Sequence, residues 1–250
     1  MSWHLGPLAA LDLETTGLDP LRARIVSAAV IVVRAQRGTI AADDETRWLA
    51  MERLAWTVGD VKIPAEATAI HGITTEQAAA EGRPAQRVVG EIGSVLARVV
   101  ERGIPVVAMN APYDLTVLDR ELWRHGWPSL VLKAGREPLV LDPMVLDRHV
   151  DQARTGRRTL VDLAAHYRVP HTAPHEAAAD ALAAVRVVDA IARRHPQLAE
   201  LPLLELHKRQ RAWARAQAGQ RAARYAAEGR VERVNGQWPI IPRPRNGGPK

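Results

Sequence analysis

Cysteine and phenylalanine are both absent from the 250 residues of the chain. Without cysteine, the protein can form neither disulfide bonds nor metal sites built on thiolates, although this absence does not identify a cellular compartment. Long apolar runs are also missing, and the stretch from Ile25 to Val33 is far too short to span a bilayer. The opening residues, MSWHLGPLAALDLE, lack the basic start and uninterrupted apolar run of a signal peptide. We therefore expect a cytoplasmic protein with no membrane partner.

Positive charge is concentrated near the C-terminus. Residues 205–250 contain 11 Lys and Arg against 3 Asp and Glu, whereas the preceding 204 residues contain 23 against 25. A basic segment of this kind is typical of proteins that bind nucleic acid. A solvated basic helix has the same composition, and the two interpretations carry almost equal weight.

The pattern of apolar residues predicts a mixed α/β domain. Strands are expected at 7–13, 24–34, 46–52, 104–109 and 139–141, the first three forming an antiparallel meander. Helices are expected at 84–102, 113–125, 159–167, 175–194 and 203–228. This order predicts a sheet flanked by helices in residues 1–204, followed in residues 205–250 by a basic helical extension and a loose Pro/Gly-rich tail. The pattern alone fits many folds and does not identify a function.

Two acidic residues lie at the end of the first predicted strand. Because side chains alternate along a strand, Asp12 and Glu14 share one face, on which the preceding residue is the small Ala10. Two carboxylates this close repel each other, which raises their pKa values unless a cation offsets the repulsion. Such a pair is costly to bury without a metal ion or a basic partner. A D-x-E sequence on its own, however, is more often a solvated strand end.

Two further acidic motifs occur later in the chain. Asp114 opens a helix directly after an apolar strand, at the edge where open α/β sheets bind ligands. His175 and Asp180 occur in HEAAAD at the start of another helix, whose alanines leave room for a close neighbour. Glu176 is an alternative to Asp180, since residues four apart share a helix face. Each motif alone is more typical of an ordinary helix start than of catalysis.

Taken in order, these motifs resemble the DnaQ-like DEDDh exonucleases. The resemblance rests on D-x-E in the first strand, N-x3-D after the fourth strand and H-x4-D on a late helix. It is extended by DLETTG, by IHGIT at 70–74 and by LVDLAAHYRV, and it covers residues 7–195. Met109 departs from the family pattern, in which His commonly precedes the Asn. The resemblance implies a ribonuclease H-like five-stranded mixed sheet and 3′→5′ exonuclease activity.

The resemblance also implies a role for each motif residue. The carboxylates expected to hold two Mg²⁺ or Mn²⁺ ions are Asp12, Glu14, Asp114 and Asp180. His175 is expected to act as the general base. Side chains expected to contact the terminal nucleotide are Thr15, Thr16, His71 and Asn110. The products are then nucleoside 5′-monophosphates, released from the 3′ ends of single-stranded nucleic acid.

Three histidines occur close together before and within the last motif. His166, His171 and His175 have H-x4-H-x3-H spacing. Zinc sites usually contain thiolates or a pair of histidines on one helix face, and this segment has neither. We therefore expect His166 on a helix surface and His171 in a loop, with no zinc site.

Several functions share the same catalytic residues. DNA is the favoured substrate, with RNA trimming as the alternative, and the motifs do not distinguish proofreading from DNA repair. Because the chain has no polymerase domain, proofreading requires a polymerase partner, for which the C-terminal extension is a candidate docking element. A non-catalytic nucleic-acid-binding module on the same fold is a further alternative, although all five motif positions are intact.

Overall fold

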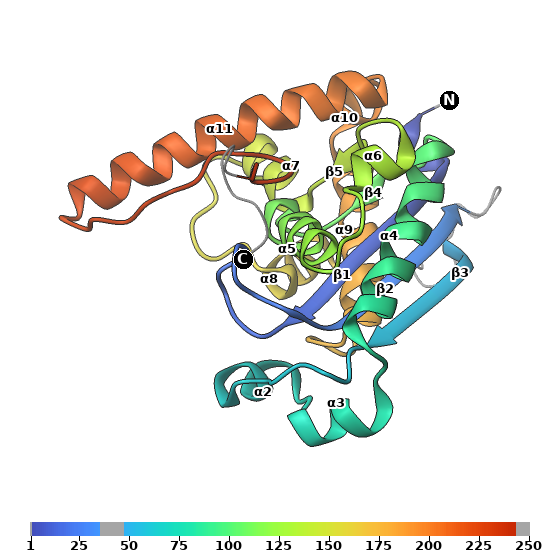
Figure 1. Cartoon of the computed structure of the whole chain (residues 1–250). Coiled ribbons are helices and arrows are strands. Elements are labelled where there is room, and N and C mark those ends of the chain that lie inside the picture. The colour runs from blue at the N-terminus through green and yellow to red at the C-terminus, as the bar shows by residue number, and fades with distance from the viewer. Residues whose placement is uncertain (1, 36–47, 244–250) are drawn as a thin grey trace.

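The computed structural model of the chain describes residues 2–35 and 48–243 and contains a five-stranded sheet between two layers of helices (Figure 1). The strand order is β3-β2-β1-β4-β5. The strands are β1 (Pro7–Thr15), β2 (Ile25–Ala35), β3 (Trp48–Thr57), β4 (Val106–Val107) and β5 (Val140–Leu141). β1, β2 and β3 pair antiparallel, whereas β4 and β5 lie parallel to β1. The predicted mixed sheet and its initial meander are confirmed.

Helices follow one another around this sheet. They are η1 (Trp3–Leu5), α2 (Ala65–His71), α3 (Thr75–Glu81), α4 (Ala85–Glu101), α5 (Ala111–Arg124), α6 (Leu130–Ala134), α7 (Pro143–Val150), α8 (Leu160–Tyr167), α9 (Ala177–Arg194), α10 (Pro196–Ala199) and α11 (Leu203–Ala227). Among the described residues, no helix is long and apolar enough to cross a membrane.

Alternation along the central strands divides the core into two halves. On β1, Leu11 and Leu13 face the layer that contains α4 and α5, while Leu8 and Ala10 face the layer that contains α8 and α9. β2 is buried along almost its whole length, as expected for a strand covered on both faces. Asp12 and Glu14 therefore point to the side of the sheet on which α9 packs.

The C-terminal segment is packed onto this domain. In Figure 1, α11 runs along one side of the molecule and projects beyond it, and the chain then turns back toward the body of the protein. Two buried side chains of α11 bind the backbone of β5: His207 Nδ1 accepts from Val140 N (3.0 Å), and Gln210 Nε2 donates to Val140 O (2.9 Å). In the returning segment, Trp238 is only 4% exposed.

The expectation of a loose tail is therefore wrong around Trp238, whose large apolar side chain is buried against the core. Ile241 is also held, since its amide donates to Thr116 Oγ1 at 2.9 Å. The end of the predicted tail, residues 244–250, lies outside the described residues. The division of the chain at residue 204 stays a prediction.

The sequence pattern predicts α4, α5, α8, α9 and α11 but not α2, α3, α6, α7 and α10. Apolar periodicity needs a window of about 11 residues or more, which the missed helices do not fill, whereas the similarly short α8 is predicted from the apolar residues of LVDLAAHY. Two of them carry readable start signals: Thr74 and Gln77 form a capping box before α3, and Asp142 and Pro143 begin α7.

The third strand also differs from its prediction. β3 continues to Thr57, whereas the prediction ended at residue 52, and residues 46 and 47 lie outside the described residues. β3 is an edge strand with an exposed face, so polar side chains such as Glu52 and Arg53 interrupt its apolar pattern. β4 is shorter than the predicted strand at 104–109.

Candidate active site

Separate parts of the chain converge on one edge of the sheet. Because β1, β4 and β5 are parallel, the segments that follow them begin at the same edge. Asp12 and Glu14 lie near the end of β1, Asp114 in the first turn of α5, and Asp180 in the first turn of α9. The four carboxyl groups lie close enough to influence each other's ionisation. The structure thus brings together the acidic residues of all three sequence motifs.

Burial and repulsion between carboxylates raise the pKa values of Asp12, Glu14 and Asp114, which together with Asp180 form what we call the acidic cluster. Burial raises the pKa of Asp12 well above its usual range, and the other three acids raise it further. The pKa of Glu14 is raised to about 7, chiefly by burial and then by Asp180. Burial also raises the pKa of Asp114, although backbone amides, including that of Leu13 at 3.1 Å, oppose the shift. The deprotonated cluster is therefore unfavourable unless positive charge is added.

The donor atoms of the cluster fit divalent cations that prefer oxygen ligands. Among the described residues, no lysine or arginine forms an ion pair with Asp12, Glu14 or Asp114, so no side chain supplies the missing charge. Glu14, His175 and Asp180 each offer a ligand atom, and these atoms lie within 4.8 Å of one another. Carboxylate oxygens suit Mg²⁺ or Mn²⁺, and the chain has no thiolate that would select zinc.

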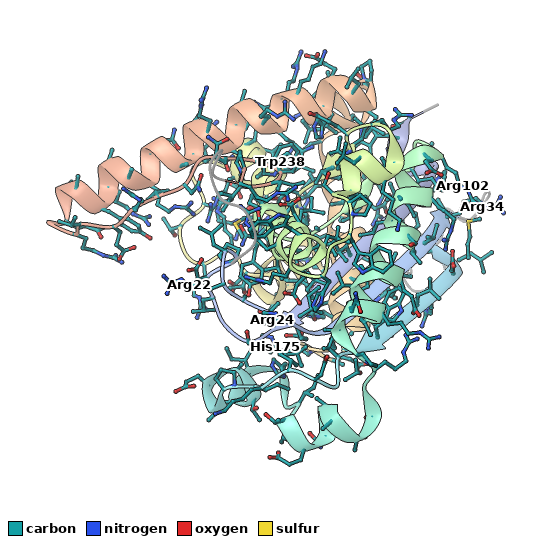
Figure 2. The ribbon with its side chains drawn as sticks, viewed as in Figure 1. Arg22, Arg24, Arg34, Arg102, His175 and Trp238 are labelled. Carbon is teal, nitrogen blue, oxygen red and sulfur yellow. The ribbon has the colours of Figure 1, made fainter. Side chains whose placement is uncertain are left out.

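His175 lies just before α9 and not within it. A helix is predicted from residue 175, but α9 begins at Ala177, and His175 has a left-handed backbone with φ of 67°. Its amide donates to Asp180 Oδ2 (3.2 Å), which holds this exposed histidine beside the acid. Figure 2 shows His175 at the end of the sheet nearest α2 and α3.

A second histidine reaches the same carboxylate. His171 lies in a loop, as expected, but its Nε2 is 2.6 Å from Asp180 Oδ1 and its side chain is only 5% exposed. The two residues are nine positions apart, with irregular chain at 172–176 between them, and no periodicity predicts such a contact. Glu176, the alternative acid, is exposed at the N-cap of α9. Asp180, not Glu176, therefore joins the cluster.

A sequence profile of the exonuclease family RNase_T matches residues 9–188, well over half of the chain. The protein belongs to this DnaQ-like exonuclease family. The family groups exonucleases, which hydrolyse phosphodiester bonds, so the predicted family and enzyme class are confirmed. No curated protein sequence matches the chain.

Solved structures of exonuclease I resemble this exonuclease. One, described in terms of how processivity is achieved, has a TM-score of 0.63 and 19% identity over 77% of this chain. E. coli exonuclease I with a dT13 oligonucleotide has a TM-score of 0.60 and 19% identity over 77%. The enzyme from Methylocaldum szegediense has a TM-score of 0.59 and 21% identity over 89%. The exonuclease spans only 42–45% of the length of these chains. At this identity the likeness shows the predicted ribonuclease H-like fold.

Two of the predicted nucleotide-binding residues of the exonuclease hold the turn after β1. The Thr15 hydroxyl pairs with the Tyr113 hydroxyl and donates to Gly17 O (3.2 Å). The Thr16 hydroxyl accepts from the Arg24 amide at 2.9 Å. Both side chains lie beside the acidic cluster, but the hydrogen bonds in which they take part are internal.

The other two residues predicted to contact the nucleotide are His71 and Asn110. His71 ends α2 close to Thr15 and His175, and its pKa is lowered chiefly by burial. Its Nδ1 accepts from the Ile73 amide (3.1 Å), while its buried Nε2 has no hydrogen bond of good geometry among the described residues. Asn110 is exposed and does not cap α5 with its side chain. The Asn110 side chain is open to a ligand, whereas His71 Nε2 is buried beside the Thr15 backbone.

A residue that the sequence analysis missed positions the start of α5. Asp142 is only 1% exposed and accepts from the amides of Asn110 (3.1 Å) and Ala111 (3.0 Å). It also caps α7 through Met144 N (3.0 Å) and accepts from Trp238 Nε1 (3.2 Å). An Asp-Pro pair is a readable helix start, but nothing local to it predicts the contacts with α5 and Trp238.

Proposed function

We propose that the protein is a 3′→5′ exonuclease that releases nucleoside 5′-monophosphates from single-stranded nucleic acid, preferably DNA. The observation that carries this proposal is the meeting of four carboxyl groups at one sheet edge without a lysine or arginine partner among the described residues. Membership of the exonuclease family supports the reaction. Structures of exonuclease I with dT13 and dA16 oligonucleotides support the substrate.

The acidic cluster would hold two Mg²⁺ or Mn²⁺ ions, which when bound would lower the pKa of a water and stabilise negative charge on the 3′ oxygen. Asp12 interacts with all three other acids, so its carboxylate would be the central member of this ligand set. Asp114 is oriented by the Leu13 amide, and Asp180 by the His175 amide and the His171 ring. These hydrogen bonds fix the carboxylates in advance of binding, which reduces the entropy lost when substrate is bound.

His175 is the proposed general base, which places the protein in the DEDDh subgroup. Its imidazole lies within 4.8 Å of ligand atoms of Glu14 and Asp180 and is exposed to solvent. It can therefore accept a proton from the attacking water and pass it to bulk water. His71, which lies close to His175, and the exposed Asn110 are the proposed contacts to the terminal nucleotide.

Digestion of end-labelled oligonucleotides tests this proposal. We expect 3′-labelled single-stranded DNA to release labelled mononucleotide at once in Mg²⁺ and not in EDTA, while 5′-labelled strands shorten stepwise. Asp12→Asn, which keeps the shape of the side chain, is the matched control for trace nuclease. Cleavage that proceeds from the 5′ end, or full activity of Asp12→Asn, would reject the proposal.

The same assay decides the substrate. Blunt duplex DNA and an RNA strand of identical sequence are compared with single-stranded DNA at equal concentration. Faster digestion of RNA would keep the reaction but replace DNA as the preferred substrate. No contact among the described residues supports a polymerase partner, and we do not propose one.

A further inference from the structure

One face of α11 changes character along its length. Its buried or half-buried positions recur every three or four residues, at Leu206, Gln210, Trp213 and Gln217, and this face packs on the domain. The next positions of the same stripe are Arg221 and Arg224. A stripe that is buried in the first half of the helix thus continues as arginines where α11 projects beyond the body of the protein (Figure 1).

Helix α7 places another arginine opposite this stripe. Gln217 Nε2 donates to Val145 O (3.0 Å), so the two helices touch at this level. One turn further along each helix are Arg148 and Arg221. They are close enough that Arg221 helps to lower the pKa of Arg148, after burial and together with Arg158. Like charges therefore face each other across the gap between α7 and α11.

This gap is a cleft of about 790 Å³, which we call the arginine cleft. Its walls are α7, the segment 151–159 and the C-terminal half of α11. The arginines that line it are Arg148, Arg154, Arg157, Arg158, Arg221 and Arg224.

Nearby acids neutralise only part of this charge. Arg154 and Arg158 both bind the buried Asp147, Arg154 also lies 3.4 Å from Asp151, and Arg224 lies 3.6 Å from Glu228. Within the described ranges, 2–35 and 48–243, Arg148, Arg157 and Arg221 form no ion pair. A cleft that holds uncompensated cations close together is suited to a polyanion.

The arginine cleft is continuous with the edge of the active site. A smaller hollow of about 80 Å³ shares Met144, Arg148, Gln217 and Arg221 with the cleft. Its other lining residues include Asn110 and Pro112, at the start of the helix that carries Asp114. An unbroken path therefore leads from the N-terminus of α5 to the arginines of α11.

We propose that the arginine cleft binds the phosphates of the substrate strand on the 5′ side of the nucleotide being removed. The proposal rests on the exonuclease function proposed above and adds residues of α11 that lie beyond the matched family region, 9–188. The cleft lining contains no aromatic side chain on which a base could stack. The cleft therefore binds the backbone and is indifferent to base sequence.

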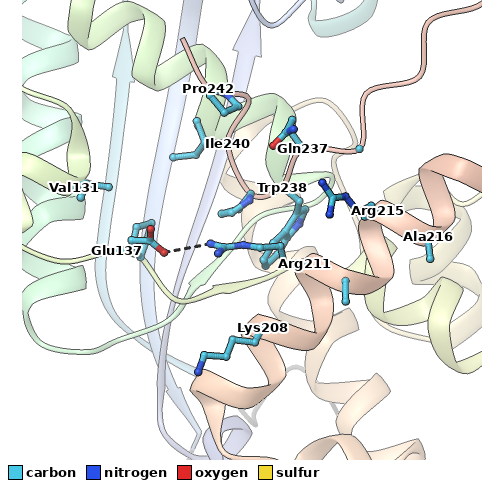
Figure 3. Close-up of a pocket in the computed structure, with 14 residues that line it drawn as sticks. Val131, Glu137, Lys208, Arg211, Arg215, Ala216, Gln237, Trp238, Ile240 and Pro242 are labelled. Carbon is cyan, nitrogen blue, oxygen red and sulfur yellow. Dashed lines mark hydrogen bonds and ion pairs between the residues drawn. The ribbon is translucent and has the colours of Figure 1, made fainter. Parts of the chain in front are cut away.

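The opposite face of α11 supplies a matched control. Lys208 and Arg215 are exposed and line a different pocket, beside Trp238 and the Arg211–Glu137 ion pair at 3.2 Å (Figure 3). Lys208→Gln/Arg215→Gln removes the same charge from the same chain as Arg148→Gln/Arg221→Gln. A general effect of net charge on nucleic-acid binding is the same for both pairs, whereas a site in the cleft responds only to the second.

The test is the dissociation constant of a fluorescent single strand of about 20 nucleotides, measured in EDTA between about 50 and 200 mM salt. Each phosphate contact contributes a slope of about 0.7 on single strands, so Arg148→Gln/Arg221→Gln should lower the slope by about 1.4. Over this range the variant should lose about 7-fold less affinity than the wild type. The control pair should keep the wild-type slope, and strands of different base composition should give equal changes.

Two further measurements distinguish a lost phosphate contact from misfolding of the variant. Melting temperature should be unchanged or higher in Arg148→Gln/Arg221→Gln, since the substitution relieves repulsion. Arg157→Gln, at an exposed position, should lower the slope by about 0.7 without any risk to the core. Equal slopes for the wild type and both double variants, or equal losses in both, would overturn the proposal. A chain that binds in this way but digests nothing in Mg²⁺ would instead reject the exonuclease function.

Discussion

Two buried acids near the same edge of the sheet, Asp142 and Asp12, have opposite surroundings. Asp142 accepts hydrogen bonds from backbone amides of α5 and α7 and from Trp238, and these oppose the rise in its pKa that burial causes. Asp12 is surrounded by carboxylates that reinforce the rise. A buried acid whose lone pairs are satisfied belongs to the fold, whereas one left in repulsion marks a place that a ligand completes.

The same contrast separates the acidic cluster from the seam between α11 and β5. In the seam, His207 and Gln210 satisfy the backbone of an edge strand, and Trp238 covers them. Substitutions in the seam should reduce stability, and substitutions in the cluster should reduce activity. The following experiments test that division, beginning with the largest expected effect.

The first experiment exchanges a carboxylate for its amide in each region. Asp12→Asn should lower turnover by about 10⁴-fold, because a metal ligand is lost, without lowering the free energy of unfolding in EDTA. Asp142→Asn should lower the free energy of unfolding by about 2 kcal/mol, because an amide cannot accept from all of its donors. Steady-state digestion and urea denaturation of both variants provide the comparison. A stability loss confined to Asp12→Asn would contradict the proposed division between the two regions.

Removing the proposed base tests the chemistry within the cluster. His175→Ala should lower turnover by roughly 10²–10⁴-fold, the usual contribution of a general base. Its affinity for Mn²⁺, measured by calorimetry, should stay close to that of the wild type. His166→Ala, on the surface of α8, is the control and should change neither quantity. Loss of metal binding in His175→Ala would make His175 a ligand and not the base.

Truncating the buried tryptophan tests the seam. Trp238→Ala removes a core side chain and its hydrogen bond to Asp142, and should lower the free energy of unfolding by about 3 kcal/mol. Val231→Ala, in the same returning segment but fully exposed, should change it by less than about 0.5 kcal/mol. Chemical denaturation measures both. A loosely held tail would predict equal, small effects for the two substitutions.

Acid should weaken the seam through His207, whose pKa is lowered to about 4, chiefly by burial. Because its pKa is near 6.5 when the chain is unfolded, the unfolded state gains the proton first as the pH falls. The contribution of neutral His207 to the free energy of unfolding is therefore fully present above pH 6.5. The free energy of unfolding should fall by about 2 kcal/mol as the pH approaches 4. His207→Gln should flatten this part of the stability profile. A profile identical to the wild type would contradict the assignment.

The sequence predicts the fold where the chain repeats a pattern over many residues. The long helices α4, α9 and α11 and the doubly buried β2 follow from periodicity, and the cluster follows from motif order. What the sequence does not predict depends on contacts that no repeating pattern encodes. The bonds of His171 to Asp180 and of Trp238 to Asp142 join residues that no local rule relates.

Charge distribution was informative but incomplete as a guide. The count along the chain locates a basic C-terminal segment, yet it does not show that α11 presents Arg221 to the arginine cleft and Arg215 to a different pocket on another face. That distinction comes from the packing of α11 on α7 and β5, which fixes the rotation of the helix.

Thermal unfolding of the wild type and Asp12→Asn, each in EDTA and in Mg²⁺, tests the central claim most directly. If bound cations relieve the repulsion within the acidic cluster, Mg²⁺ at 100 times its Kd should stabilise the wild type by about 2.7 kcal/mol. The melting temperature should then rise by roughly 5–10 °C. Asp12→Asn should melt at or above the wild-type temperature in EDTA and respond much less to Mg²⁺. A wild-type protein indifferent to Mg²⁺, or an Asp12→Asn variant that melts lower in EDTA, would contradict the claim.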